Sequence, residues 1–180
     1  MAEVSTIDMA LEVVTVPVSD VDRAKRFYQS LGWRLDADFA AGDDARLVQM
    51  TPPHSQCSIH FRKGVPGITA MAPASLQRVY LAVKDIDAAR EDLVSRGVDV
   101  SEVEEQPKPP GFPDLPGRSY FAYASFSDPD GNGWLLQEVT TRLPRAGMAG
   151  LTWTSPRWRP VARDRRAGLA PSPTTAHQVF

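Results

Sequence analysis

Polar side chains at alternate positions of two apolar segments are the first candidates for chemistry. His60 and Arg62 alternate with apolar residues in the segment 57–63, and Arg78 and Tyr80 alternate in the same way further along the chain. Imidazole exchanges protons near neutral pH, and guanidinium binds anionic or electron-rich groups through a planar fork of donors. These residue types predict a face that binds a small molecule, with His60 as the candidate acid or base.

Two more candidates lie nearer the end of the chain. Tyr123 offers a ring for stacking and a hydroxyl for hydrogen bonding, and Gln137 follows Leu135 by two positions in the last apolar segment. Simpler interpretations stay open for these residue types. They are a histidine that only stabilises the fold, an arginine paired with an acidic neighbour, and a tyrosine packed in the core.

An internal repeat supplies the elements that position these side chains. The segments 13–33 and 78–98 carry the same residue types at matching positions. In each copy, alternating apolar residues predict a strand, an aspartate (Asp20 or Asp85) predicts a helix N-cap, and a glycine predicts the end of the helix. The apolar stripe of the helix packs on the apolar face of the strand. The opposite face of the strand is then free to meet a ligand.

Further strands and one long loop complete each copy. We expect the strands at 34–39, 46–51, 57–63, 99–103, 119–127 and 134–140. Residues 104–118 contain five prolines and two glycines, which predict a loop. The predicted organisation is a first module (9–63), a linker (64–76), a second module (77–143) and a basic tail rich in proline and arginine (144–180).

The repeated pattern resembles a known family. Each copy approximates V-x-V-x-V-x-D-[VI]-D-x-A, and a DPDGN turn at 128–132 precedes the last predicted strand. These features are similar to the vicinal oxygen chelate superfamily, which includes glyoxalase I, the extradiol dioxygenases and bleomycin-resistance proteins. Over residues 9–143, the resemblance implies an α+β fold in which two βαβββ modules form curved mixed sheets around a central cavity.

The resemblance also implies where a metal would bind. In the metal enzymes of the family four ligands line the cavity, and those positions here hold Val13, His60, Arg78 and Leu135. Only His60 can bind a metal, and metal sites of this kind need three or more suitable protein ligands. A neighbouring arginine repels a cation. We therefore expect neither a metal nor another cofactor.

The residues and the resemblance together predict a binding protein. The expected partner is a small organic molecule, anionic or aromatic, which is sequestered in the manner of bleomycin-resistance proteins. The predicted cavity is lined by the candidate catalytic residue and five ligand-binding candidates: His60, Arg62, Arg78, Tyr80, Tyr123 and Gln137. The alternative is a lyase, an isomerase or a dioxygenase-like enzyme that acts through His60 or through an unrecognised metal site. Whether the protein is an enzyme stays open.

Composition excludes several other classes of protein. Residues 1–141 carry a net charge of −8, which argues against a nucleic-acid module. Residues 142–180 carry +6, which allows docking on the body or on an acidic partner, but a solvated tail is the expected structure. No run approaches about 18 apolar residues, so we expect no membrane span. The N-terminus lacks the pattern of a secretion signal. We expect a cytoplasmic protein, and the family resemblance allows for a homodimer.

Three local features have structural interpretations. Trp33 is expected in the core, and Cys57, the only cysteine, is expected to be an inert buried thiol that excludes an internal disulfide. The DPDGNG segment matches the first half of a calcium loop, but position twelve of that loop is Val139 rather than a bidentate glutamate. A tight turn is therefore the expected structure.

Overall fold

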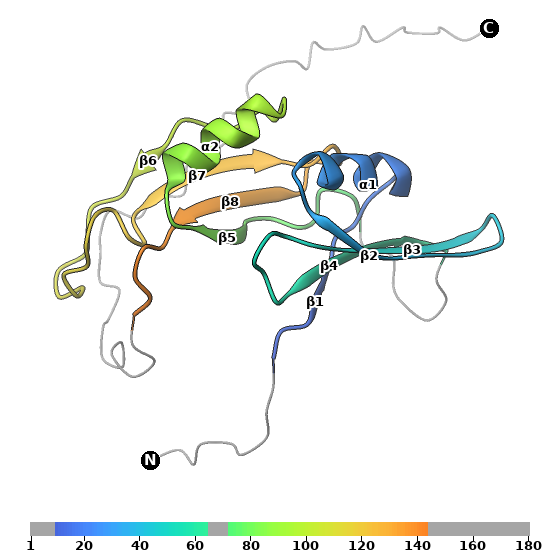
Figure 1. The fold of residues 1–180 in the computed structure, drawn as a ribbon, viewed down its shortest axis with the longest axis horizontal. Helices are drawn as coiled ribbons and strands as arrows, with labels where there is room; N and C mark the ends of the chain where they lie inside the picture. Colours follow the sequence, from blue (N-terminus) through green and yellow to red (C-terminus); the bar gives the residue numbers. More distant parts are fainter. Residues whose placement is uncertain (1–9, 65–71, 144–180) are drawn as a thin grey trace, which may run out of the picture.

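The computed structural model describes residues 10–64 and 72–143, which form two modules of similar element order (Figure 1). The first module consists of β1 (Val13–Thr15), α1 (Val21–Ser30), β2 (Arg34–Ala41), β3 (Ala45–Thr51) and β4 (Ser58–Lys63). The second consists of β5 (Val79–Val83), α2 (Ile86–Ser95), β6 (Glu104–Glu105), β7 (Ala122–Ser127) and β8 (Gly133–Glu138). The tail at 144–180 and most of the linker lie outside the described residues.

Each module builds one mixed sheet. Sheet A has the strand order β1-β4-β3-β2, and sheet B has the order β5-β8-β7-β6. The first strand of each module runs parallel to the last strand of the same module, and the other pairs are antiparallel. The sheets are not closed into a barrel. This architecture confirms the predicted α+β fold of two βαβββ modules.

The helix boundaries follow the predicted local signals. Asp20 accepts a hydrogen bond from the backbone N–H of Arg23 at 2.9 Å, and Asp85 accepts one from Ala88 at 3.0 Å. These are the N-cap bonds of α1 and α2. Gly32 and Gly97 follow the helices with φ of 79° and 83°, a conformation that glycine adopts without steric cost.

One hydrophobic core joins the two modules. Tyr28 and Trp33 of the first module contact Trp134 of the second, with ring centroids 5.9 Å and 5.2 Å from the Trp134 ring. Trp33 is only 6% exposed, which confirms its predicted place in the core. Because α1 packs on β3 and β4, and α2 packs on β7 and β8, each sheet turns one face towards a helix. The opposite faces, here called the outer faces, carry no helix of the described chain (Figure 1).

Two predicted strands differ from the observed ones. The strand expected at 99–103 is reduced to an isolated bridge between Val100 and Phe126, and regular pairing begins only at β6. Ser101 donates its backbone N–H to the Ser125 oxygen at 2.9 Å, but the return bond from the Ser125 N–H goes to the side-chain hydroxyl of Ser101 instead of its carbonyl. The strand expected at 119–127 begins at Ala122 instead, because residues 118–121 form a turn with Tyr120 at φ 69°.

Cys57 differs from its predicted environment. The predicted burial of Cys57 is wrong, because this residue lies in the turn before β4 and is only partly buried. Burial and the nearby Glu12 raise the pKa of the Cys57 thiol, which fits the predicted low reactivity.

Each described helix has ten residues, and neither is long and apolar enough to cross a membrane.

Candidate functional site

The outer face of sheet A carries His60 and Arg62. The strand register places His60 beside Thr15 on one side and Gln49 on the other, and it pairs Arg62 with Leu47. Ile59 and Phe61, which alternate with them in β4, are buried in the core. The predicted separation of β4 into an apolar face and a polar face is therefore correct.

His60 is held by a neighbouring strand. Its Nε2 lies 2.6 Å from Thr15 Oγ1 in a hydrogen bond between β4 and β1. Burial lowers the pKa of His60 below its ordinary value, and the cationic Arg62 lowers the pKa further. The imidazole is therefore neutral at neutral pH and can act as a base or as a hydrogen-bonding group.

Acidification is expected to destabilise the protein partly through His60. Between roughly pH 7 and pH 5 the unfolded chain binds a proton at this imidazole more readily than the folded chain does, so stability falls as pH falls. His60→Gln removes this contribution. Urea unfolding across that pH range should show a steeper loss of stability for the wild-type protein than for His60→Gln. Parallel pH profiles of the two proteins would contradict the assigned environment.

The outer face of sheet B carries the aromatic and amide candidates. Tyr80 in β5 is 54% exposed, and its cross-strand neighbour in β8 is Leu135. One row further, Gln137 lies between Ala82 and Tyr123. Tyr80, Ala82, Tyr123, Leu135 and Gln137 define the outer face of sheet B.

Hydrogen bonds fix the polar part of this face. Gln137 Nε2 donates to the backbone oxygen of Tyr120 at 3.2 Å and to the hydroxyl of Tyr123 at 3.1 Å. The Tyr123 hydroxyl donates to the same Tyr120 oxygen. Burial raises the pKa of Tyr123, so its hydroxyl stays protonated at neutral pH. Sequence reasoning missed Tyr120, whose left-handed backbone gave no recognisable residue signal.

Arg78 occupies a less regular position. It lies immediately before β5, is exposed, and has a φ of 58°. Its backbone nitrogen would lie 3.3 Å from a Cβ placed at Gly133, so glycine lets the two segments approach closely. Arg78 therefore stands at the rim of sheet B rather than on the strand where the sequence placed it.

The six candidates fall into two groups. His60 and Arg62 belong to sheet A, whereas Tyr80, Tyr123 and Gln137 belong to sheet B and Arg78 to its rim. Among the hydrogen bonds and ion pairs of residues 10–64 and 72–143, none joins the first group to the second. Convergence of the two groups on one cavity stays a prediction.

The four positions that hold metal ligands in the related metal enzymes do not fit a metal here. Val13 and Leu135 offer no donor atom, and Arg78 is a cation. The Nε2 of His60 is already engaged by Thr15. Within the described part of the chain, no group of three or more histidine, cysteine, aspartate or glutamate side chains could hold a metal ion.

A polar hollow of about 520 Å³ lies between the start of α1 and the β2–β3 hairpin. Three of its charged side chains pair with one another: Arg46 contacts Asp22 at 2.7 Å and Asp38 at 2.8 Å. Arg46, followed by Lys25, holds the pKa of Asp38 well below its usual range. Because these three groups satisfy one another, they offer little to a ligand.

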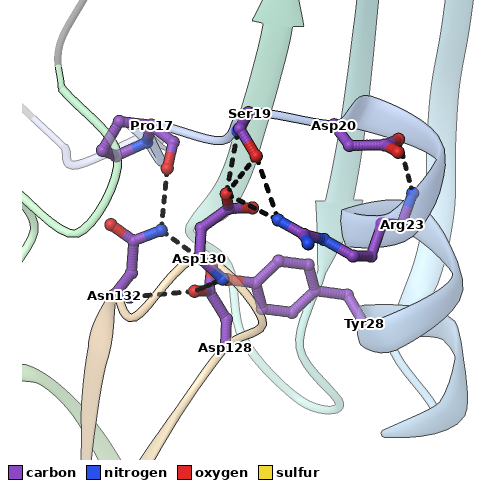
Figure 2. A network of polar contacts seen from close by, with 8 residues as sticks. All are labelled: Pro17, Ser19, Asp20, Arg23, Tyr28, Asp128, Asp130 and Asn132. Atoms are coloured by element: carbon purple, nitrogen blue, oxygen red, sulfur yellow. Dashed lines mark hydrogen bonds and ion pairs between the residues drawn. The ribbon is translucent and has the colours of Figure 1, made fainter.

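The DPDGN turn does more than reverse the chain. Asp128 accepts bonds from the backbone N–H groups of Asp130 and Asn132, as expected for a turn. It also accepts the Tyr28 hydroxyl at 2.8 Å, and Asn132 Nδ2 donates to the Pro17 oxygen at 2.8 Å. The turn of the second module thus binds the first module, and Figure 2 shows these contacts.

Asp130 adds an ionic contact to this interaction. Its carboxylate accepts the Ser19 backbone N–H at 3.0 Å, the Ser19 hydroxyl at 2.6 Å and Arg23 Nη2 at 2.8 Å. We call the whole set the inter-module clasp; its members are Pro17, Ser19, Arg23, Tyr28, Asp128, Asp130 and Asn132. Burial and the nearby Asp128 raise the pKa of Tyr28, so its hydroxyl remains a donor.

A second polar cluster fixes the long loop to sheet B. Arg118, at the end of the loop, contacts Glu138 at 3.1 Å, Asp87 at 2.5 Å and Glu105 at 3.4 Å. Glu138 is buried and also accepts the first backbone N–H of α2, from Ile86, at 3.3 Å. The loop, the helix and the last strand therefore meet at one arginine.

Comparison with known proteins identifies the family. The family model described as Glyoxalase/Bleomycin resistance protein/Dioxygenase superfamily matches residues 10–136. TnmS3, an antibiotic binding protein from Streptomyces sp. CB03234, is 33% identical over 75% of this chain and 98% of its own, with a TM-score of 0.52. A glyoxalase/bleomycin resistance protein from the same organism is 32% identical over 72% of this chain and 100% of its own, with a TM-score of 0.51.

A more distant structure shares the fold alone. The bleomycin resistance determinant encoded on the transposon TN5 is 20% identical over 75% of this chain and 100% of its own, with a TM-score of 0.50. No curated protein sequence matches the chain. The family match covers most of the described residues and agrees with the observed pair of βαβββ modules. The chain therefore belongs to the glyoxalase/bleomycin resistance protein/dioxygenase superfamily.

Proposed function

We propose that this protein binds a small organic molecule on the outer faces of its sheets and sequesters it without a metal. The observation that carries the proposal is the outer face of sheet B. Tyr80, a residue that is 54% exposed, lies there near an ordered pair of polar side chains, Tyr123 and Gln137. Aromatic surface combined with a few fixed polar groups is typical of small-molecule sites.

The relatives support the same class of function. TnmS3, at 33% identity, is described as an antibiotic binding protein, and this activity is carried over here as a proposal. Arg62 on sheet A and Arg78 at the rim of sheet B add donors for an anionic or electron-rich group. The proposal requires no metal, because the family's ligand positions hold side chains unsuited to one.

A second copy of the chain is the proposed cover for the outer faces. Phe39 in β2 is 70% exposed on the outer face of sheet A, where it pairs with Leu47, and Tyr80 in β5 is exposed on the outer face of sheet B. Large apolar side chains in such positions favour association. We accordingly propose a homodimer, in the cytoplasm, in which the ligand is enclosed between subunits. Sedimentation velocity of the full chain tests this, and a monomer at all concentrations would contradict it.

An enzyme remains the second candidate, because of His60. The imidazole is bonded to Thr15, and its lowered pKa leaves it neutral and able to accept a proton. A lyase or isomerase of this kind would turn over the ligand rather than retain it. Recovery of the bound compound, chemically unchanged after long incubation, would remove this candidate.

The test of the proposed function is a pair of substitutions on sheet B. A thermal-shift screen of aromatic antibiotics, including bleomycin, identifies a binder, whose dissociation constant is then measured by calorimetry. Tyr80→Ala is expected to weaken binding by about tenfold, since burial of an aromatic ring contributes on the order of 1.5–3 kcal/mol. Arg78→Ala is expected to weaken the binding of an anionic compound. Both side chains are exposed, so thermal stability should hardly change.

The control is Val94→Ala, which truncates a 45%-exposed apolar side chain on α2, away from the outer faces. Affinity should be unchanged in this variant. Binding that survives a chelating agent supports the metal-free proposal, whereas loss of binding on chelation would reject it. Equal affinities of wild type, Tyr80→Ala and Arg78→Ala would place the ligand elsewhere.

A further inference from the structure

Two side-chain donors on the outer face of sheet B point to the same acceptor, the backbone oxygen of Tyr120. A carbonyl oxygen can only accept hydrogen bonds, so the two groups that face the Tyr120 oxygen must both donate. One is the Tyr123 hydroxyl, and the other is the Gln137 amide at 3.2 Å. This requirement fixes the orientation of the Gln137 amide, because its oxygen would repel the Tyr120 oxygen.

The second amide hydrogen of Gln137 is also used. With its only proton given to Tyr120, the Tyr123 hydroxyl can only accept from Gln137, whose Nε2 lies 3.1 Å away. Both amide hydrogens of Gln137 and the hydroxyl hydrogen of Tyr123 are therefore engaged in hydrogen bonds. Within the described residues no donor reaches Gln137 Oε1, so this oxygen remains available as an acceptor.

The backbone, rather than a ligand, sets this arrangement. Tyr120 is held in the left-handed region at φ 69°. Its backbone N–H donates at 2.7 Å to the backbone oxygen of Glu138, at the end of β8. Its hydroxyl accepts the N–H of Leu143 at 3.2 Å. Because both ends of Tyr120 are tied, its carbonyl keeps a constant direction and keeps the amide of Gln137 turned the same way.

The strand neighbours of the free oxygen are mostly apolar. Ala82 lies across from Gln137 in β5, Leu135 precedes it by two positions in β8, and the exposed ring of Tyr80 lies one row away. Glu104, the cross-strand neighbour of Tyr123 in β6, adds another acceptor at the edge. The oxygens of Gln137 and Glu104 can only accept hydrogen bonds, so an anion placed between them would meet no donor from either oxygen.

We propose that the outer face of sheet B binds a planar aromatic group that carries an N–H or O–H donor, with Gln137 Oε1 as the acceptor. The inference rests on the proposed function. That proposal allows an anionic or an aromatic ligand, whereas this one specifies an aromatic ligand that donates a hydrogen bond to sheet B. Gln137 is the specificity-determining residue. Tyr123 is a positioning residue, because its hydroxyl accepts a hydrogen bond from the Gln137 amide and holds that amide in one orientation.

Indole and 1-methylindole test the proposal, since they share a ring system and differ in one N–H donor. Each is titrated into the ¹⁵N-labelled full chain, and the backbone amide shifts of β5, β7 and β8 are followed. Indole is expected to bind about three- to tenfold more tightly than 1-methylindole, which is the effect of one net hydrogen bond. Equal affinities, or no shifts in these strands with either compound, would overturn the proposal.

Two variants locate the source of the preference. Gln137→Met keeps the length of the side chain but removes the acceptor, so the affinity ratio of the two compounds should fall to about one. Tyr123→Phe frees one amide hydrogen of Gln137, so the amide can turn and the ratio should also shrink. Gln29→Met makes the same chemical change on the exposed surface of α1 and should keep the wild-type ratio. A full ratio in both Gln137→Met and Tyr123→Phe would reject the assignment.

The outcome separates this inference from the proposed function. If both compounds bind sheet B equally well and Tyr80→Ala weakens both, the ligand-binding face stands and the role of Gln137 falls. If neither compound shifts β5, β7 or β8 while a larger compound from the screen still loses affinity in Tyr80→Ala, the donor preference is rejected alone. If Tyr80→Ala affects no compound, both proposals fail.

Discussion

Asp128→Ala is expected to lower the free energy of unfolding by at least about 3 kcal/mol, because it leaves several buried donors without an acceptor. The carboxylate, in a residue only 5% exposed, accepts the Tyr28 hydroxyl, two backbone N–H groups and the Asn132 side-chain amide, all at 2.8–2.9 Å. Two of these donors also orient the clasp, since Tyr28 belongs to α1 and Asn132 bonds to Pro17. Denaturant unfolding measures the loss.

The matched control is Asp43→Ala, which removes an exposed carboxylate from the β2–β3 turn. Its effect should stay within about 0.5 kcal/mol. Tyr28→Phe removes a single hydroxyl from the clasp and should give an intermediate loss. If Asp128→Ala is no more harmful than Asp43→Ala, the clasp does not stabilise the contact between the modules.

Arg118→Ala is expected to lower the free energy of unfolding by about 2 kcal/mol, because it leaves a buried carboxylate without its cationic partner. The Glu138 side chain is only 7% exposed and lies 3.1 Å from the arginine. By contrast, Arg34→Ala breaks a pair in which the arginine is 74% exposed, and exposed pairs contribute little. A comparison of the two variants by thermal unfolding separates the buried ion pair from the surface one.

The double variant Arg118→Ala with Glu138→Gln gives a further check. A neutral amide has a much smaller need for a cation than a carboxylate has, so the second substitution should recover part of the lost stability. An additive loss in the double variant would show that Arg118 acts through Asp87 or Glu105 instead.

Local physics explains why much of the fold was predictable. The caps at Asp20 and Asp85 and the stops at Gly32 and Gly97 depend on residues within a few positions of each other. The alternation around His60 likewise depends only on strand geometry, so the polar face of β4 could be assigned from sequence. Repetition of these signals in two copies then indicated the pair of modules.

Long-range contacts explain what the sequence could not provide. The apolar stripe of α1 predicted that Tyr28 is buried, but the partner of its hydroxyl lies 100 residues away. The DPDGN motif did carry a usable signal, since two carboxylates and an amide beside apolar strands require hydrogen-bond partners. The tight-turn interpretation explained these side chains by local bonds, so their partners in the first module were not predicted. The same limit applies to Glu138, which ends a strand and whose partner Arg118 comes from an irregular loop.

The candidate site divides in the same way. Tyr123 and Gln137 were both predicted as ligand-binding residues, and in the structure they pair across β7 and β8 and share a hydrogen bond. Their role in binding stays a prediction. Their common partner, the carbonyl of Tyr120, depends on a backbone conformation that residue types do not reveal. Convergence with His60 depends on how two sheets face one another, which neither alternation nor spacing determines.

The clasp has a consequence for how the chain is made. Translation delivers Pro17 and Tyr28 more than ninety residues ahead of Asn132 and Asp128, so a nascent first module leaves the ribosome with its tyrosine hydroxyl and ring cluster unmatched. Contacts of such high sequence separation slow folding and leave apolar surface open in the meantime. The first module thus keeps apolar surface exposed until the second module has been synthesised.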